Sequence, residues 1–473
     1  MEVLKMNKQR SGKLPLSVKF GYGAAEGANS LTFTLFYAYG MFFFTDVVGL
    51  SPAFAGMILA VGTIWNAVCG IVVGVFSDSI KWKWGRRRPF ILGMAVPFGL
   101  LSWLMFTDFK LSPILTEVYF FIMVLVYWTV FTLLEVPYTA LAGEMTQDYD
   151  ERTSLNGWRA GWSQVAAIIG AGTPLIMAGY FGEIWGGKHF GWSFAAFVYG
   201  LASVPLILIA WKVTKGRELF PEETKVHIKD VWYAVFKNRS FPYIMAVYAF
   251  ALIAMTIAGS VGVYFMTYLM GFSHIQISIA FLILFGLTVF WIPVIDIISE
   301  RLGKRVAWMI FMGMWAFVHV VLIQFVVQPG NIILFYIGLA LASGGAVAIY
   351  QLGWSMIPDC VEVDEYKTGH RREGLYYGVA SLAQKAGCSL SLWIVGVMLS
   401  LVGYAPNATQ SQSALSGIRS LYGIGVGSFL ILSVIVAYFV PMTKMKHTAL
   451  RECITLRKEG KEYDEQSIKD IIR

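Results

Sequence analysis

Charge is scarce in this sequence of 473 residues. Aspartate, glutamate, lysine and arginine together make up 14% of the chain, whereas hydrophobic residues make up 57%. Soluble domains carry about a quarter charged residues, so a chain this long and this poor in charge requires a lipid environment. The composition therefore excludes an ordinary soluble domain and predicts an integral membrane protein.

Cysteine is also rare. The four cysteines have neither paired nor metal-ligand spacing, so the sequence predicts no disulfide framework and no zinc site; they are Cys69, Cys360, Cys388 and Cys453. No catalytic triad, phosphate-binding loop or metal cluster stands out, and we expect neither an enzyme nor a cofactor. The basic N-terminus lacks a short apolar stretch with a cleavage site, so no signal peptide is expected.

Long apolar segments dominate the rest of the chain. They cover residues 20–45, 53–77, 90–107, 114–142, 160–181, 192–211, 241–270, 275–298, 306–327, 331–357, 375–403 and 416–440. Most approach or exceed the roughly 20 residues that a helix needs to cross the bilayer core. We therefore predict an all-α membrane protein of twelve transmembrane helices, with both termini on one side.

Basic residues are distributed unevenly between the two predicted sides. Lys110, Lys188 and Arg419 fall opposite the termini, Lys385 lies inside an apolar segment, and the other lysines and arginines fall on the side of the termini. Short cytoplasmic loops hold the excess of positive charge, so both termini are predicted to be cytoplasmic in a multi-pass protein of the inner (cytoplasmic) membrane. This distribution accounts for the net charge of +8 without nucleic acid as a partner.

A hydrophilic stretch at 212–240 divides the predicted crossings six and six. Transporters are commonly built from two such halves, so we expect two pseudo-symmetric six-helix bundles. The expected parts are a cytoplasmic N-terminus, a first bundle, a cytoplasmic linker, a second bundle and a cytoplasmic tail, at residues 1–19, 20–211, 212–240, 241–440 and 441–473.

The loops after the second and eighth segments are alike. Each has an acid at a helix end and a basic turn led by glycine; the residues are Asp78, Arg86, Arg87 and Arg88 in the first loop, and Glu300 and Arg301 in the second. The charges could simply anchor the topology. They could also form a conformational latch, in which an acid and arginines of opposite halves pair in one state and separate in another. The two interpretations are compatible.

Few ionisable side chains fall within the apolar segments. The main ones are Glu26, Glu135, Arg159 and Lys385. Such a group costs several kcal/mol at membrane depth unless it is paired or hydrated, so each is a functional candidate. Helical spacing adds Asn29 to the face of Glu26, and Tyr350 and Trp354 add polar and aromatic groups from the second half. This mixture suits a sugar. The alternative is that Glu135 and Arg159 form an ion pair that only holds helices together.

Five motifs occur in order along the chain. They are Gly21-Tyr22 with Glu26 and Asn29, Phe44-Thr45-Asp46-Val47-Val48-Gly49-Leu50, Trp84-Gly85-Arg86-Arg87-Arg88-Pro89-Phe90, Glu135-Val136-Pro137-Tyr138, and Asp359-Cys360-Val361-Glu362 through Glu365-Tyr366. Together they resemble the glycoside–pentoside–hexuronide:cation symporters of the major facilitator superfamily (MFS). The resemblance runs from about Gly21 to Thr443. It implies the MFS fold and the transport of a sugar, glycoside or uronide with a cation by alternating access.

The resemblance also implies roles for single residues. Glu26, Glu135 and Arg159 match positions that bind sugar in the melibiose permease. Lys385 matches a lysine near the cation site, and Tyr350 or Trp354 matches an aromatic residue at the sugar. The substrate-binding residues predicted in all are Glu26, Asn29, Glu135, Arg159, Tyr350, Trp354 and Lys385.

The second segment departs from the sodium-coupled members of that family. They carry two aspartates and an arginine where this chain has Thr63, Asn66 and Gly70. The same region is closer to the sucrose:proton symporters. We therefore expect a transported proton in preference to sodium, with three residues in the coupling: Glu26, Glu135 and Lys385.

The expected partners are a sugar or glycoside and the lipid bilayer, and we expect a monomer. The sequence leaves other functions open. One alternative is a transporter of a lysolipid or another amphiphile with the same fold. Others are a sugar uniporter and a membrane receptor that transports nothing.

Overall fold

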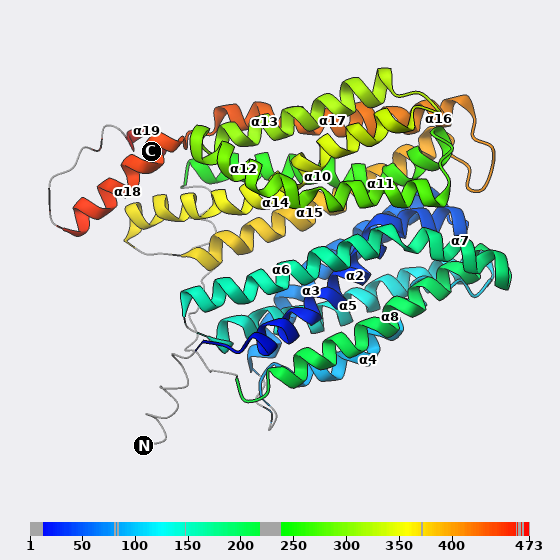
Figure 1. Ribbon diagram of the computed structural model, residues 1–473, viewed down its shortest axis with the longest axis horizontal. Helices are drawn as coiled ribbons and strands as arrows, with labels where there is room; N and C mark the ends of the chain where they lie inside the picture. The colour runs from blue at the N-terminus through cyan, green and yellow to red at the C-terminus, as the bar shows by residue number, and fades with distance from the viewer. Residues whose placement is uncertain are drawn as a thin grey trace. The chain divides into compact units, whose positions relative to one another are not determined.

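The protein is helical in a computed structural model (Figure 1). The structure describes residues 13–79, 82, 85–146, 148–217, 238–369, 372–459, 461, 465 and 468–472. Within this part there is no strand, only an isolated bridge between Trp82 and Gly85, so the predicted all-α class is confirmed. The side chain of Asp78, the first twelve residues and most of the predicted linker lie outside the described residues.

The first half of the chain forms seven α-helices and a π-helical turn. They are α2 (Leu16–Phe42), η1 (Phe43–Val47), α3 (Pro52–Ser79), α4 (Arg88–Leu104), α5 (Pro113–Met145), α6 (Tyr149–Gly172), α7 (Pro174–Trp185) and α8 (Lys188–Val213). The predicted segment 160–181 is divided between α6 and α7, because Pro174 has no backbone N–H to continue α6.

The second half also forms α-helices and π-helical turns, and two further helices follow its last apolar segment. Its elements are α10 (Ser240–Tyr264), η2 (Phe265–Leu269), α11 (His274–Gly286), α12 (Thr288–Leu302), α13 (Lys304–Phe317), η3 (Val318–Val326), α14 (Ile332–Thr368), α15 (Glu373–Leu401), α16 (Gln412–Ser420), η4 (Leu421–Gly425), α17 (Val426–Phe439), α18 (Lys444–Lys458) and α19 (Lys469–Ile472).

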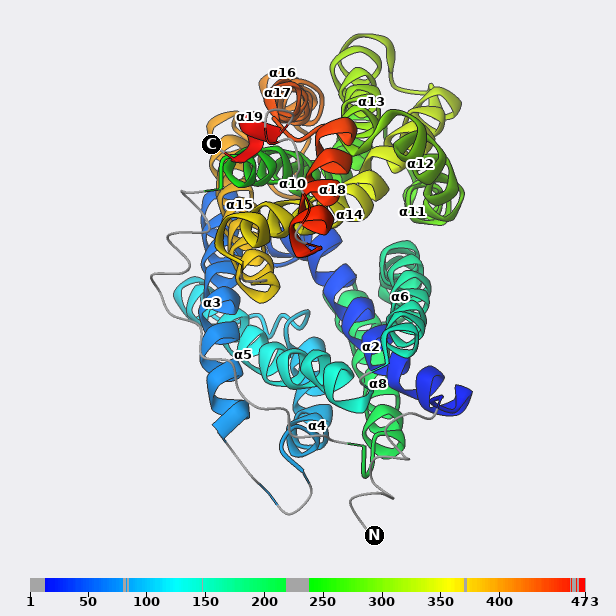
Figure 2. The ribbon, with the colours of Figure 1, turned by 90° about the vertical axis from the view of Figure 1, so that its left-hand side faces the viewer.

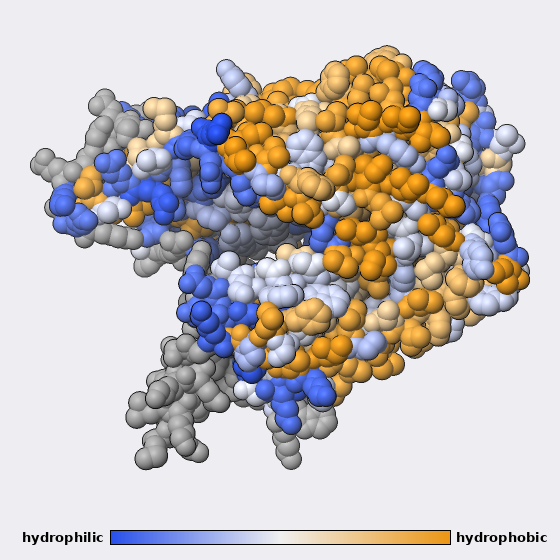
Figure 3. Space-filling view, viewed as in Figure 1, coloured by the Kyte–Doolittle hydropathy of each residue, from blue (hydrophilic) through white to orange (hydrophobic). Residues whose placement is uncertain are grey.

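Helices lie over every predicted apolar segment. Among the described residues, nine helices are long and apolar enough to cross a membrane, and ten if the bent pair α6–α7 counts as one span. Apolar side chains cover the lengths of the helices and hydrophilic ones gather at their ends (Figure 3); Val75, Ile114 and Leu401 are each more than 70% exposed. This surface fits a lipid environment, while the count of twelve crossings and the side of the termini stay predictions.

Contacts divide the described chain into two compact units. The first unit contains the chain before residue 224, with residues 272–285 and 405–409; the second contains the remainder. Residues 272–285 include most of α11, whose Phe285 carbonyl accepts a hydrogen bond from Gln164 Nε2 at 2.7 Å. The first unit therefore includes a short helical segment from the second half of the sequence.

Glycines bring α2 and α6 close together within the first unit. A Cβ atom on Gly23 would lie 2.6 Å from Trp162 Cδ1 and 2.9 Å from the Trp158 carbonyl, and one on Gly27 would lie 2.8 Å from Trp162 Cε3. The two helices run side by side in both ribbon views (Figures 1 and 2). Only residues without a side chain fit at these crossings, and the close approach brings polar groups of α2 and α6 within reach of each other.

The first helix of each half ends in the same way. After α2, η1 closes with a hydrogen bond from Val48 N to the Phe43 carbonyl at 3.0 Å, and after α10, η2 closes with one from Met270 N to the Phe265 carbonyl at 3.1 Å. A glycine with positive φ follows each turn, Gly49 at 86° and Gly271 at 64°. The two stretches share phenylalanine, threonine, glycine and serine at matching positions. The two stretches form an internal repeat. The similarity between the loops after the second and eighth apolar segments did not reveal it.

Candidate functional site

An ion pair joins α2 to α6. Both Nε and one terminal nitrogen of Arg159 lie close to Glu26 Oε2, at 2.9 and 2.5 Å. The two side chains are 17% and 18% exposed. A charge-assisted pair with two donors is stronger than a neutral hydrogen bond, and it offsets part of the cost of removing both charges from water.

Two tyrosines lie beside the arginine. The hydroxyl of Tyr22 donates to the Tyr138 carbonyl at 2.5 Å, and the hydroxyl of Tyr138 donates to the Tyr22 carbonyl at 2.9 Å. Both residues are fully buried. The Arg159 guanidinium lies 5.1 Å from the centre of the Tyr138 ring, where the ring attracts a cation. The reciprocal bonds tie α2 to α5 beside the ion pair.

Asn29 and Glu135 form a second contact between α2 and α5. Asn29 Nδ2 donates a hydrogen bond to Glu135 Oε2. Asn29 is 3% exposed, and its Oδ1 accepts no hydrogen bond from the described residues. A buried acceptor is costly when it has no donor. This atom could therefore receive a hydrogen bond from a ligand hydroxyl.

An aromatic wall lies on the same helices. Phe33 of α2 has its ring centre 6.1 Å from those of Trp128 and Phe131 of α5. Trp128 is almost fully buried, yet its Nε1 donates no hydrogen bond to the described residues. The prediction of the site omitted these rings. The available signal was spacing, because Phe33 lies seven residues after Glu26, which is two helical turns on the same face.

The stretch of α3 that departs from the sodium-coupled pattern is hydrogen-bonded within the first unit. Thr132 Oγ1 donates to Asn66 Oδ1 at 3.0 Å, and Thr63 Oγ1 donates to the Leu59 carbonyl at 2.9 Å. Throughout the described part of the chain, no group of three or more His, Cys, Asp or Glu could hold a metal ion. A hard cation prefers carboxylate oxygens, and neither Thr63 nor Asn66 provides one.

The other three predicted site residues lie in the second unit. Trp354 of α14 stacks on Tyr377 of α15 with ring centres 5.6 Å apart, and Tyr248 of α10 meets it edge-on at 6.1 Å. Tyr350 is 47% exposed, and Lys385 on α15 is half-buried. The structure thus brings four predicted residues together in the first unit and adds Tyr248 and Tyr377 to Trp354 in the second.

The predicted latch arginines have partners inside the first unit. Arg86 and Arg87 both contact Glu144 Oε1, at 2.8 and 2.9 Å, and Glu144 is 1% exposed. Arg88 donates to the Trp211 carbonyl at 3.0 Å. Glu144, which lies near the end of α5, was not among the predicted latch residues.

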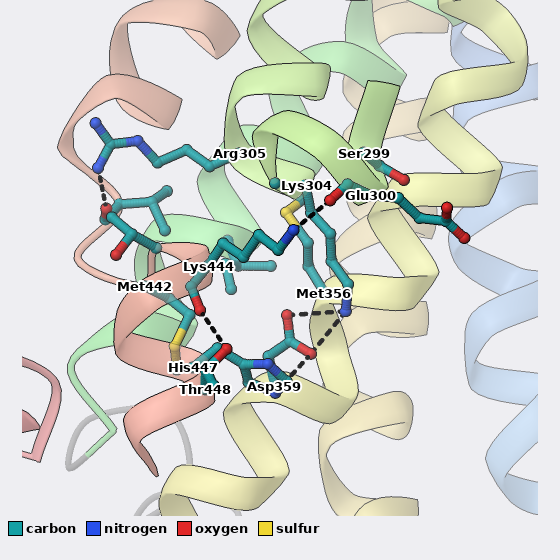
Figure 4. Close-up of a pocket in the computed structure, with 14 residues that line it drawn as sticks. Ser299, Glu300, Lys304, Arg305, Met356, Asp359, Met442, Lys444, His447 and Thr448 are labelled. Carbon is teal, nitrogen blue, oxygen red and sulfur yellow. Dashed lines mark hydrogen bonds and ion pairs between the residues drawn. The ribbon is translucent and has the colours of Figure 1, made fainter. Parts of the chain in front are cut away.

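The remaining latch residues, Glu300 and Arg301, are exposed near the end of α12 in the second unit. The carbonyl of Glu300 accepts a hydrogen bond from Lys444 Nζ (Figure 4). The pairing of the two loops across the halves stays a prediction.

Comparison with known proteins identifies the family. The sequence profile of the MFS/sugar transport proteins matches residues 20–444. The chain belongs to this family. This transporter is therefore not an enzyme, and its resemblance to the glycoside–pentoside–hexuronide:cation symporters is confirmed.

Two relatives resemble the transporter along almost its whole length. One is an uncharacterized symporter of Synechocystis sp., 28% identical, with 95% of this chain and 98% of the relative covered. Another is the isoprimeverose transporter of Lactiplantibacillus pentosus, 27% identical, with 89% and 88% covered.

Among solved structures, a bacterial homologue of the human lysosomal transporter Spinster has a similar fold. The TM-score is 0.69 at 13% identity, with 91% of this chain and 97% of that chain covered. Together with the family match, this likeness confirms the predicted MFS fold.

Proposed function

We propose that this transporter is a symporter that carries a sugar, glycoside or uronide with a proton across the inner membrane by alternating access. The observation that carries the proposal is the pair of contacts along α2, where Glu26 binds Arg159 and Asn29 binds Glu135. Ionisable groups at membrane depth are costly and rare, so each is a functional candidate. The family and the names of the two relatives support a sugar and a symport mechanism.

Polar and aromatic groups of the first unit can each contact a sugar. Arg159 can donate and Glu26 can accept hydrogen bonds from hydroxyls, while Asn29 Oδ1 offers a further acceptor. The ring of Phe33, which is partly exposed, can pack on the apolar face of a pyranose. We assign Tyr350, Trp354 and Lys385 to the same substrate from the second unit.

Glu135 is the better candidate for carrying the proton. Glu26 is in direct contact with the Arg159 guanidinium, whereas Glu135 accepts a hydrogen bond from Asn29 and interacts with Arg159 less strongly than Glu26 does. Proton exchange at Glu135 therefore breaks no direct ion pair with Arg159. We also assign Glu26 and Lys385 to the coupling, as charged groups that do not carry the proton. Proton binding couples to transport if the inward and outward states bind the proton with different affinities.

Vesicle transport tests this proposal. Purified protein in liposomes would receive labelled neutral glycosides and uronides under an imposed proton gradient or an imposed sodium gradient. We expect accumulation with the proton gradient alone. In the Glu135→Gln variant, a preloaded sugar should still exchange with external sugar, whereas gradient-driven accumulation should fall to passive equilibration.

A matched control lies on the same helix. Glu117 is exposed near the start of α5, so Glu117→Gln changes the charge of α5 equally and should leave accumulation unchanged. Proton-driven accumulation by Glu135→Gln at the level of the unmodified protein would remove Glu135 from the mechanism. Accumulation with sodium alone would overturn the proton assignment.

A further inference from the structure

A cavity of about 280 Å³ lies at one end of the second unit (Figure 4). It is lined mainly by residues of α13, α14 and α18 and of the segment 440–443, which joins α17 to α18. Helix α13 begins directly after α12, and α18 follows the last apolar helix. The cavity therefore lies where apolar helices end, on the predicted cytoplasmic side.

The tail forms one wall of this cavity. Helix α18 packs along α14, and the two lie side by side in Figure 2. Leu450 and Cys453 of α18 are 0% and 4% exposed. His447, which lines the cavity, has its Nε2 2.9 Å from Glu362 Oε2 and 3.5 Å from Asp359 Oδ1, both on α14. These contacts fix the start of α18 at the cavity.

The N-termini of two helices meet there. A Cβ atom on Gly303, the residue before α13, would lie 3.0 Å from the Cβ atom of Lys444, the first residue of α18. Neither helix has an acidic residue in its first turn. The N-terminal end of a helix has unpaired N–H groups and a partial positive charge, which attract anions. Both helices therefore favour an anion in the cavity.

Three cationic side chains line the same cavity. Lys304 Nζ lies 2.7 Å from Asp359 Oδ1, so these two charges compensate each other. Lys444 and Arg305 instead donate to main-chain carbonyls. The Glu300 carboxylate points away from Lys444 (Figure 4). Among the described residues, Lys444 and Arg305 thus form no ion pair with a carboxylate, and their positive charges are available to an anion.

Exposed apolar side chains flank the cavity. Leu302, Phe439 and Met445 are 53%, 62% and 84% exposed, and each is the sequence neighbour of a residue that lines the cavity. Apolar side chains at the ends of apolar helices can contact the acyl chains of a lipid. A free phosphate ion would gain nothing from them. The surroundings of the cavity therefore favour a lipid as the source of the anion.

We propose that this cavity binds the phosphate group of an anionic phospholipid. Lys444 and Arg305 bind the phosphate, and the acyl chains lie on Leu302, Phe439 and Met445. Basic pockets at the cytoplasmic ends of transmembrane helices bind the headgroups of anionic lipids in this way. Because one cation belongs to α18 and the other to α13, a single phosphate links the tail to the bundle. The site contains none of the residues assigned to the sugar.

Native mass spectrometry of the full-length protein in detergent tests this proposal. The protein is titrated with phosphatidylglycerol or with phosphatidylcholine of the same acyl chains, and inorganic phosphate is then added as a competitor. Phosphatidylcholine keeps the phosphate and the chains but has no net charge. We expect one phosphatidylglycerol to bind more tightly than phosphatidylcholine and to stay bound when an equal concentration of inorganic phosphate is added.

Variants locate the bound lipid. Lys444→Gln and Arg305→Gln should each weaken phosphatidylglycerol binding about fivefold, because a basic residue near the membrane surface contributes about 1 kcal/mol toward an anionic lipid. Lys444→Arg keeps the charge and should retain the affinity. The matched control is Lys446→Gln on the same helix, since Lys446 pairs with Asp470 and lies outside the lining of the cavity. It should leave the affinity unchanged.

Three results would overturn the proposal. Equal affinity for the two lipids in the unmodified protein would do so without any variant. Unchanged phosphatidylglycerol binding in both Lys444→Gln and Arg305→Gln would place the lipid elsewhere. Displacement of the lipid by an equal concentration of inorganic phosphate would make the free ion the ligand. No sugar and no ion gradient enter the assay, so failure here is distinct from failure of the transport proposal.

Discussion

The two halves of this transporter share a scaffold and differ in chemistry. Counted back equally from the π-helical turns, Glu26 of α2 corresponds to Tyr248 of α10, and Asn29 corresponds to Ala251. The first unit thus has an ion pair and an amide where the second has an aromatic ring and a methyl group. A repeated fold can therefore assign charge to one half and ring surface to the other.

The largest expected effect comes from breaking the ion pair of the first unit. Glu26→Gln leaves the Arg159 guanidinium with a neutral partner, and breaking a buried pair typically costs about 3 kcal/mol or more. We expect uptake to be lost and the melting temperature of the purified protein to fall. Tyr248→Phe at the corresponding position should reduce the uptake and the melting temperature much less. Equal losses would mean that the two positions are not chemically distinct.

An intermediate effect is expected at the glycines of α2. Gly23→Ala places a Cβ 2.6 Å from Trp162, and overpacking of this kind costs about 1–3 kcal/mol. Thermal unfolding of the purified variant measures the loss. Gly259→Ala is the control, because a Cβ there meets no atom within 4 Å and should leave stability the same or slightly higher. A Gly23→Ala protein as stable as the parent would contradict the close packing of α2 on α6.

The smallest expected effect concerns the aromatic wall. Trp128→Phe keeps a ring but removes Nε1, which donates no hydrogen bond to the described residues. If a sugar hydroxyl accepts from it, the loss of one hydrogen bond should raise the KM for uptake about fivefold while the maximal rate changes little. Trp354→Phe gives the comparison from the second unit. A KM unchanged by Trp128→Phe would place the sugar elsewhere.

Composition and hydropathy were sufficient to predict the helical membrane fold, because each long apolar segment has few ways to satisfy its backbone in lipid. Helical spacing also placed Glu26 and Asn29 on one face. The sequence could not decide which groups pair. The alternative of a Glu135–Arg159 pair was open, whereas the structure joins Arg159 to Glu26, because glycines on α2 determine how closely α6 approaches.

The tail was predicted only as a cytoplasmic extension. Leu450 and Cys453 are three residues apart, a spacing that indicates one buried helical face, but the acids that receive His447 lie far away in the sequence. Long-range pairing of this kind depends on the packing of α14, which no local pattern reveals.

The matched π-helical turns bear on the history of the chain. A bond from residue i to i+5 encloses one more residue than an α-helical bond, so each turn holds one residue more than a turn of α-helix. The wide turn lies at the same place after α2 and after α10, with the same phenylalanine, threonine, glycine and serine around it. Duplication of one ancestral half that already had this turn accounts for both.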